Sequence, residues 1–214
     1  MGVLKKIGIF GGTFDPVHIG HLRMALELKQ CAGFDELRLV PCHQPPHRGV
    51  PRVSSLQRAK MLSIALQNCK ELMLDERELA RDKPSYTFDT LQDFRRDFGE
   101  NVSLTLCMGE DAFAGLATWH RWQEIIELAH VLVVARPGWA TPQSGDVYEF
   151  LNSHRGQLSD IEHRPAGSIV LQTLRLLPIS ATEIRQEIVE GRSAQFLVPD
   201  GVWDYICDNQ LYRH

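Results

Sequence analysis

Short apolar runs alternate with longer amphipathic stretches along most of the chain, and this alternation constrains the fold more than any other feature. Six runs are short and aliphatic enough to be strands: 7–10, 37–40, 72–74, 102–108, 131–135 and 169–174. Stretches with helical spacing lie between or after them: 22–30, 54–67, 88–98, 122–128, 180–190 and 202–207. Strands that alternate with helices predict βαβ units. We therefore expect a Rossmann-like, doubly wound α/β fold: a mostly parallel sheet with helices on both faces.

The length of 214 residues fits one domain that covers the whole chain, residues 1–214. Residues 138–167 are polar and lack clear periodicity, which predicts a surface excursion with at most a short helix near 147–151. Residues 179–214 should form a helical C-terminal part. Two helix starts have the spacing of a capping box: Ser54 with Gln57, and Ser180 with Glu183.

Charge and cysteine usage exclude several classes of protein. A net charge of −4 offers no general attraction to nucleic acid or to an anionic membrane. The five cysteines lack CxxC spacing, which argues against a disulfide framework and a zinc site. No signal-peptide pattern is present, and no apolar run approaches the ~20 residues of a membrane span. We expect a cytoplasmic protein without nucleic-acid, membrane or obligate protein partners.

The loop after the first strand carries the strongest chemical signal. Glycines there let a ligand approach the backbone closely, and two histidines three residues apart can share one face of a helix start. The helix dipole favours an anion at that position. An ordinary tight turn with two surface histidines is the alternative reading, and a zinc site would need a third ligand. The loop reads Gly11-Gly12-Thr13-Phe14-Asp15-Pro16-Val17-His18-Ile19-Gly20-His21.

This loop resembles the signature of the nucleotidyltransferases that share a His-x-Gly-His motif and fold with class I aminoacyl-tRNA synthetases. The chain has neither a G-x-x-x-x-G-K-[ST] nor a G-x-G-x-x-G sequence, the signatures of two other phosphate-binding loops. The resemblance implies that His18 and His21 bind triphosphate oxygens and stabilise the transition state at the α-phosphorus. It also implies ATP contacts by Gly11, Gly12, Thr13 and Phe14.

A second candidate phosphate site follows the last predicted strand. Ser180 is placed to cap a helix, Thr182 offers a hydroxyl in its first turn, and Arg185 lies one turn further on. An ordinary capped helix with an exposed arginine is the alternative. The sequence resembles the I-S-x-T-x-x-R element that grips the β- and γ-phosphates of ATP in the same superfamily. Arg185 thereby joins the two histidines as a candidate catalytic residue.

Further polar and aromatic residues follow the other predicted strands. Each stretch alone reads equally well as a loop, a turn or part of the core. Their shared position matters, because the carboxyl ends of parallel strands form the ligand-binding edge of such a sheet. The residues are His47, Arg48, Ser85, Tyr86, Thr87, Gly109, Asp111, Trp119 and Arg136.

Together these stretches resemble the bacterial nicotinate-nucleotide adenylyltransferases, from residue 7 to Arg213. The resemblance implies that Gly109 and Asp111 contact ATP, with Asp111 on its ribose. Trp119 would stack on a pyridine ring, and the backbone at Tyr86-Thr87 would receive a carboxylate. His47, Arg48, Ser85 and Arg136 complete the implied acceptor site, with the arginines near its phosphate. One departure is present: Cys42 and His43 precede Pro-Pro-His, where the family usually carries Asn.

The implied reaction is transfer of AMP from ATP to nicotinate mononucleotide, giving nicotinate adenine dinucleotide (deamido-NAD) and pyrophosphate. The acceptor phosphate is already a nucleophile, so neither a general base nor a covalent residue is needed. Mg²⁺ should arrive with the triphosphate rather than occupy a protein metal site. Three alternatives stay open: an adenylyltransferase acting on nicotinamide mononucleotide or phosphopantetheine, a non-catalytic nucleotide-binding protein, and an RNA-binding module.

Overall fold

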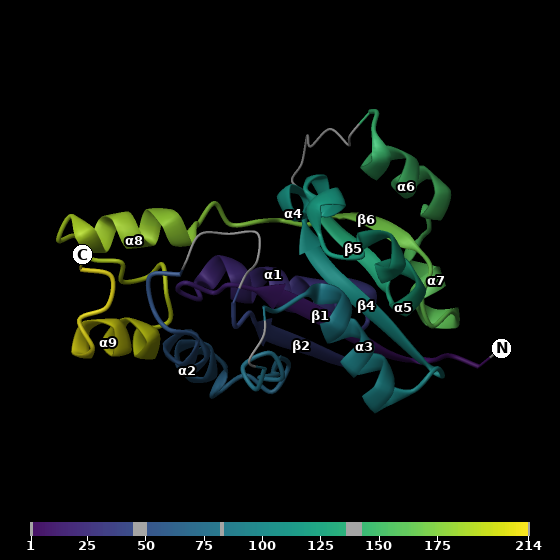
Figure 1. Ribbon diagram of the computed structural model, residues 1–214. Coiled ribbons are helices and arrows are strands. Elements are labelled where there is room, and N and C mark those ends of the chain that lie inside the picture. Colours follow the sequence, from purple (N-terminus) through teal and green to yellow (C-terminus); the bar gives the residue numbers. More distant parts are fainter. Residues whose placement is uncertain (1, 45–50, 82–83, 136–142, 214) are drawn as a thin grey trace.

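The computed structural model describes residues 2–44, 51–81, 84–135 and 143–213. A six-stranded sheet forms its centre, with strand order β3-β2-β1-β4-β5-β6 and every neighbouring pair parallel (Figure 1). All six predicted strands are confirmed. They are β1 (Lys5–Gly12), β2 (Glu36–Pro41), β3 (Met73–Leu74), β4 (Val102–Gly109), β5 (His130–Ala135) and β6 (Ile169–Thr173).

Helices follow the strands in the predicted alternation. The stretch expected as one helix over 122–128 is divided into a 3₁₀ turn and a short α-helix. The α-helices are α1 (Ile19–Ala32), α2 (Ser55–Leu66), α3 (Thr87–Phe98), α4 (Glu110–Ala114), α5 (Ile125–Leu128), α6 (Asp146–His154), α7 (Leu158–His163), α8 (Ala181–Val189) and α9 (Asp200–Asp208). The 3₁₀ helices are η1 (Leu116–Thr118) and η2 (Trp122–Glu124).

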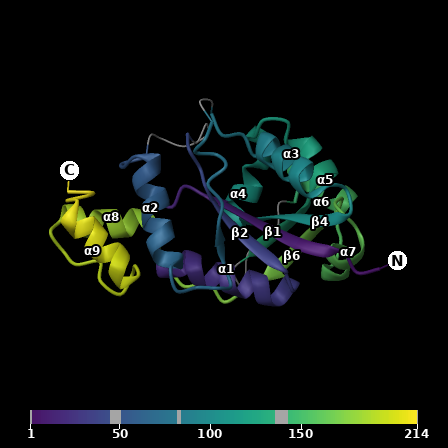
Figure 2. The ribbon, with the colours of Figure 1, turned by 90° about the horizontal axis from the view of Figure 1, so that it is seen from below.

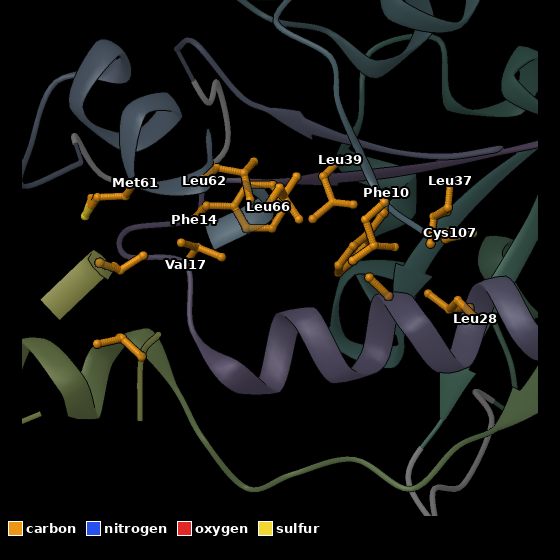
Figure 3. Close-up of a cluster of buried hydrophobic side chains, with 14 of the residues drawn as sticks. Phe10, Phe14, Val17, Leu28, Leu37, Leu39, Met61, Leu62, Leu66 and Cys107 are labelled. Carbon is orange, nitrogen blue, oxygen red and sulfur yellow. The ribbon is translucent and has the colours of Figure 1, made fainter. Parts of the chain in front are cut away.

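Two apolar layers cover the sheet, one on each face. Along β5, Leu132 and Val134 belong to the first layer and Val131 and Val133 to the second, as the two-residue period of a strand requires. Helices α1, α2 and α7 cover the first layer, which continues beyond the carboxyl ends of the strands to α8 and α9 (Figure 1). Figure 3 shows side chains from this layer. The second is closed by α3, α4, α5 and α6. A doubly wound α/β fold with helices on both faces is therefore confirmed.

Residues 143–163 lie in the stretch where the sequence predicts a surface excursion, and they form α6 and α7. Phe150 and Leu151 of α6 and Ile161 of α7 are buried, so this part of the chain adds to the core. Only a few apolar residues face inward from each short helix. Too few apolar positions therefore repeat at helical spacing for the sequence to predict both helices. The single-domain organisation stays a prediction.

A buried arginine at the end of α3 joins the amino-terminal ends of three strands. Among the described residues, the hydrogen bonds that Arg95 donates all go to backbone carbonyl oxygens, and Arg95 lies far from the carboxyl edge of the sheet. Five donors in a planar fork allow one guanidinium to hold several chain segments together. The acceptors are the carbonyls of Gly99, Val102, Leu128 and Pro165.

The five cysteines are free thiols, as the sequence predicts. Among the described helices, none combines the length and the apolar character needed to cross a membrane. A cytoplasmic location and the absence of nucleic-acid, membrane or obligate protein partners stay predictions.

Candidate active site

The strand order reverses between β1 and β4, and the candidate site lies at the carboxyl ends of these two strands. From β1 the chain passes to α1 on one face, and from β4 to α4 on the other. Phe10 pairs with Cys107, so Gly12 and Gly109, each two residues further on, lie at the same level. A Cβ added to Gly11 or Gly109 would meet no described atom within 4 Å. A ligand can therefore approach both backbones.

His18 is the N-cap of α1, and its ring is held in one orientation. Its Nδ1 accepts a hydrogen bond of 3.3 Å from the backbone N–H of His21, and the two imidazole rings stack with centroids 3.6 Å apart. Burial lowers the pKa of His18 to about 4, so the ring is neutral at pH 7. A neutral ring that accepts at Nδ1 carries its proton on Nε2. His18 is therefore a fixed Nε2–H donor at a helix N-terminus.

Two glycines in the motif are required by close packing. A Cβ on Gly20 would lie 3.0 Å from His18 Nδ1 and 3.5 Å from Ile179 Cβ, so a side chain there would displace the imidazole. A Cβ on Gly12 would lie 2.8 Å from the ring of Phe14. Phe14 is buried with a φ of 50°, an unusual conformation for a phenylalanine, and its ring meets that of His21 edge-on.

The second predicted phosphate element is joined to the first loop. Ser180 caps α8 by accepting from the N–H of Glu183, which confirms the predicted cap, although the reciprocal bond of a full capping box is not formed. Arg185 donates to Thr182 Oγ1 at 3.2 Å and to the carbonyl oxygen of Asp15 at 2.6 Å. The guanidinium thus connects the helix start to the glycine loop across 170 residues of sequence.

Asp15 is a buried carboxylate that sequence reasoning did not select. The hydroxyl of Tyr212 donates to its Oδ1 at 2.9 Å, and the N–H of Arg52 donates to its Oδ2 at 3.1 Å. Burial and the nearby Asp15 raise the pKa of Tyr212, so the phenol keeps its proton and remains a donor. Asp15 lies within the glycine motif, but nothing local in the sequence indicates a partner at residue 212. The C-terminal segment is thereby fastened to the loop.

The predicted acceptor residues of α3 lie beside a second segment. Tyr86 is the N-cap of α3 and makes no side-chain capping bond to the described part of the helix, so the backbone amides of the first turn are not capped from within. The Tyr86 and His120 rings lie 4.6 Å apart, and the Arg121 guanidinium lies 3.7 Å from the centre of the Phe88 ring. Neither His120 nor Arg121 is among the site residues that the sequence predicts.

Two more of the predicted site residues follow β4 in the chain. Trp119 follows η1 and is half-buried against the second apolar layer, while Asp111 is exposed in the first turn of α4. His47, Arg48 and Arg136 lie outside the described residues.

The Cys42–His43 pair replaces the asparagine expected in the family. His43 Nδ1 lies 2.8 Å from Ser55 Oγ, so the imidazole is bonded to the start of α2. Burial, with a contribution from Glu78, raises the pKa of Cys42 to about 12, and its thiol is protonated at neutral pH. Neither side chain reproduces an amide.

Comparison with known proteins agrees with this geometry. The cytidylyltransferase-like family pattern matches residues 9–187. A Cellvibrio japonicus protein named probable nicotinate-nucleotide adenylyltransferase is 56% identical over 97% of this chain and 98% of its own length. A Pseudomonas putida (strain W619) protein of the same name is 46% identical over 98% and 96%. The chain therefore belongs to the cytidylyltransferase-like family, and within that family to the nicotinate-nucleotide adenylyltransferases.

A solved structure shares the fold at low sequence identity. The Plasmodium falciparum nicotinic acid mononucleotide adenylyltransferase complexed with NaAD superposes with a TM-score of 0.76 at 17% identity, covering 97% of each chain. At this identity the likeness concerns the fold alone.

The buried N-cap position of His18 should appear in its titration. By NMR of the imidazole nitrogens, His18 should stay neutral, with its proton on Nε2, down to about pH 5. The unfolded chain takes up this proton near pH 6.5 and the folded protein only near pH 4, so stability should fall as the pH drops between these values. The full His18 contribution is about 3 kcal/mol. A titration midpoint near 6.5 would contradict the buried, neutral assignment.

Proposed function

We propose that this chain transfers the adenylyl group of ATP to nicotinate mononucleotide, releasing pyrophosphate and forming nicotinate adenine dinucleotide, a step of NAD biosynthesis. The single observation that carries the proposal is the stacked His18–His21 pair at the N-terminus of α1, with Arg185 bonded to the same loop. Ring and guanidinium donors, together with a helix N-terminus, suit a triphosphate. The names of the close relatives support the choice of acceptor.

The proposed roles follow from this arrangement. His18 and His21 bind oxygens around the α-phosphorus, and Ser180, Thr182 and Arg185 hold the outer phosphates. The loop backbone lies against ATP at Gly11, Gly12, Thr13 and Phe14. The ribose side of ATP is bound by Gly109 and Asp111. ATP enters as its Mg²⁺ complex. Among the residues that the structure describes, no group of three or more His, Cys, Asp or Glu side chains could hold a metal ion.

The acceptor is proposed to bind between α3 and the segment after η1. Amides at the start of α3, around Tyr86 and Thr87, would receive the nicotinate carboxylate, since a helix N-terminus favours negative charge. Ser85, the residue before Tyr86, is a further proposed contact of the acceptor, and Trp119 would offer an aromatic face to the pyridine. His47, Arg48 and Arg136 stay proposed contacts of the acceptor, the arginines near its phosphate.

The chemistry needs positioning and charge stabilisation rather than a covalent intermediate. The acceptor phosphate attacks the α-phosphorus of ATP, one P–O bond forms, and the bond to pyrophosphate breaks on the opposite side. Negative charge that develops on the transferred group meets the His18 and His21 donors. The low pKa of His18 keeps one ring neutral, so it contributes a directed dipole rather than a mobile proton.

Acceptor choice tests the carboxylate role directly. With ATP and Mg²⁺, nicotinate mononucleotide should support pyrophosphate release, and nicotinamide mononucleotide should be about 10–100-fold poorer in kcat/KM. The reason is that the amide group cannot accept charge-assisted bonds from the α3 amides. Phosphopantetheine serves as the unrelated acceptor. Equal use of acid and amide would contradict the carboxylate role, and silence with both pyridine nucleotides would contradict the proposed function.

His21 should matter to the chemical step. His21→Ala should lower kcat by about 10²–10³ with a smaller change in the KM for ATP, since one donor preorganised for the transition state is lost. His163→Ala is the matched control, because His163 is an exposed histidine at the end of α7. The control should keep wild-type kcat. An unchanged kcat in His21→Ala would remove its assigned role.

A further inference from the structure

A fully buried arginine at the carboxyl edge of the sheet has no part in the chemistry described so far. Arg58 lies in α2, and none of its surface is exposed. Its Nη1 donates to the carbonyl oxygen of Thr13 at 2.6 Å. Its Nη2 donates to the carbonyl oxygens of Cys42 at 2.6 Å and His43 at 3.0 Å. One guanidinium therefore holds the loops that follow β1 and β2.

These two loops are parts of a longer series of bonds. The Cys42 N–H donates to the carbonyl of Gly12 at 2.9 Å, and the Ser85 N–H donates to the carbonyl of Gln44 at 3.2 Å. The series runs from the glycine loop, through residues 42–44, to the residue before Tyr86. It thus connects the proposed ATP-phosphate site with the proposed carboxylate site. Arg58 donates hydrogen bonds to residues in the middle of this series, namely Thr13, Cys42 and His43.

This placement is costly for the fold. The charge of Arg58 is desolvated, which lowers its pKa, and the three acceptors described above are neutral carbonyls rather than carboxylates. Its Nε is buried without a hydrogen-bond partner among the described residues. A buried donor without a partner lowers the stability of the folded protein. Because the guanidinium is planar and rigid, it holds its acceptors at a fixed separation.

We propose that Arg58 is a positioning residue that sets the distance between the ATP-phosphate loop and the acceptor loops, without touching either substrate. The inference rests on the proposed function. An in-line transfer depends on the reacting oxygen and the α-phosphorus meeting at the correct distance and angle, and a misplacement of about 1 Å can cost 10²-fold in rate. Loss of the Arg58 fork should therefore affect the chemical step more than the binding of either substrate.

Arg95 supplies a matched control within the same chain. It is also a buried arginine that donates to several backbone carbonyls, but it joins the amino-terminal ends of the strands, at the opposite edge of the sheet. Replacing either arginine by lysine keeps the charge and removes the fork. Any difference between the two variants in activity then reports what the Arg58 fork does beyond holding the fold.

The experiment compares Arg58→Lys and Arg95→Lys with the wild type. Melting temperature, kcat and both KM values are measured below the melting temperature of all three proteins, with the pyridine nucleotide acceptor that the wild type uses. Both variants should melt at lower temperature. Arg58→Lys should lose about 10–100-fold in kcat, with smaller changes in both KM values. Arg95→Lys should keep kcat within about twofold of the wild type.

The outcomes separate this inference from the proposed function. Wild-type activity tests the function, whereas the ratio of variant to wild type tests Arg58. A kcat for Arg58→Lys equal to that of Arg95→Lys would overturn the inference. If Arg58→Lys is unfolded at the assay temperature, Arg58→Gln replaces it with the same expectation. If both Arg58 variants fail to fold while Arg95→Lys folds, Arg58 belongs to the fold alone and the inference is likewise overturned.

Discussion

All six strands of the sheet run parallel, and the placement of the site depends on this constraint. A crossover must join each strand to the next one along the chain, so the loops that leave the strands gather at one edge. Between β1 and β4 these crossovers diverge to opposite faces, which leaves the backbones of Gly11 and Gly109 open to a ligand. The two apolar layers hold this arrangement in place. The proposed ligand-binding residues therefore gather at the carboxyl edge of the sheet, beyond the apolar layers.

Around that opening, buried polar groups give the loops a defined geometry. His18 is fixed by the N–H of His21, and Asp15 by Tyr212 and the N–H of Arg52. The Tyr212 bond connects the glycine loop to the C-terminal segment, where α9 packs beside α2 (Figure 2). Because the groups are desolvated, their orientations are costly to change. A site held in this way can stabilise a transition state with little reorganisation.

The strands, most helices and the place of the glycine motif at the carboxyl edge of the sheet were predictable because they depend on local patterns. Apolar periodicity predicts each strand, and the glycine motif places His18 and His21 at a helix start. The packing of α6 and α7 against the core was not predictable, since each helix has only a few inward-facing apolar residues among many polar ones. The hydrogen bonds from Arg58 to Thr13 and from Tyr212 to Asp15 could not be predicted either. They join polar residues 45 and 197 positions apart, and sequence does not say which distant partners burial will bring together.

In the proposed reaction, positioned donors rather than a covalent enzyme intermediate carry the transfer. The stereochemical course at the α-phosphorus tests it most directly. ATP with one sulfur replacing a non-bridging α-oxygen, in a single configuration, is turned over with nicotinate mononucleotide, and the configuration of the product is determined. One in-line displacement predicts inversion at phosphorus. Retention would require two displacements through an adenylyl-enzyme, and would contradict the account.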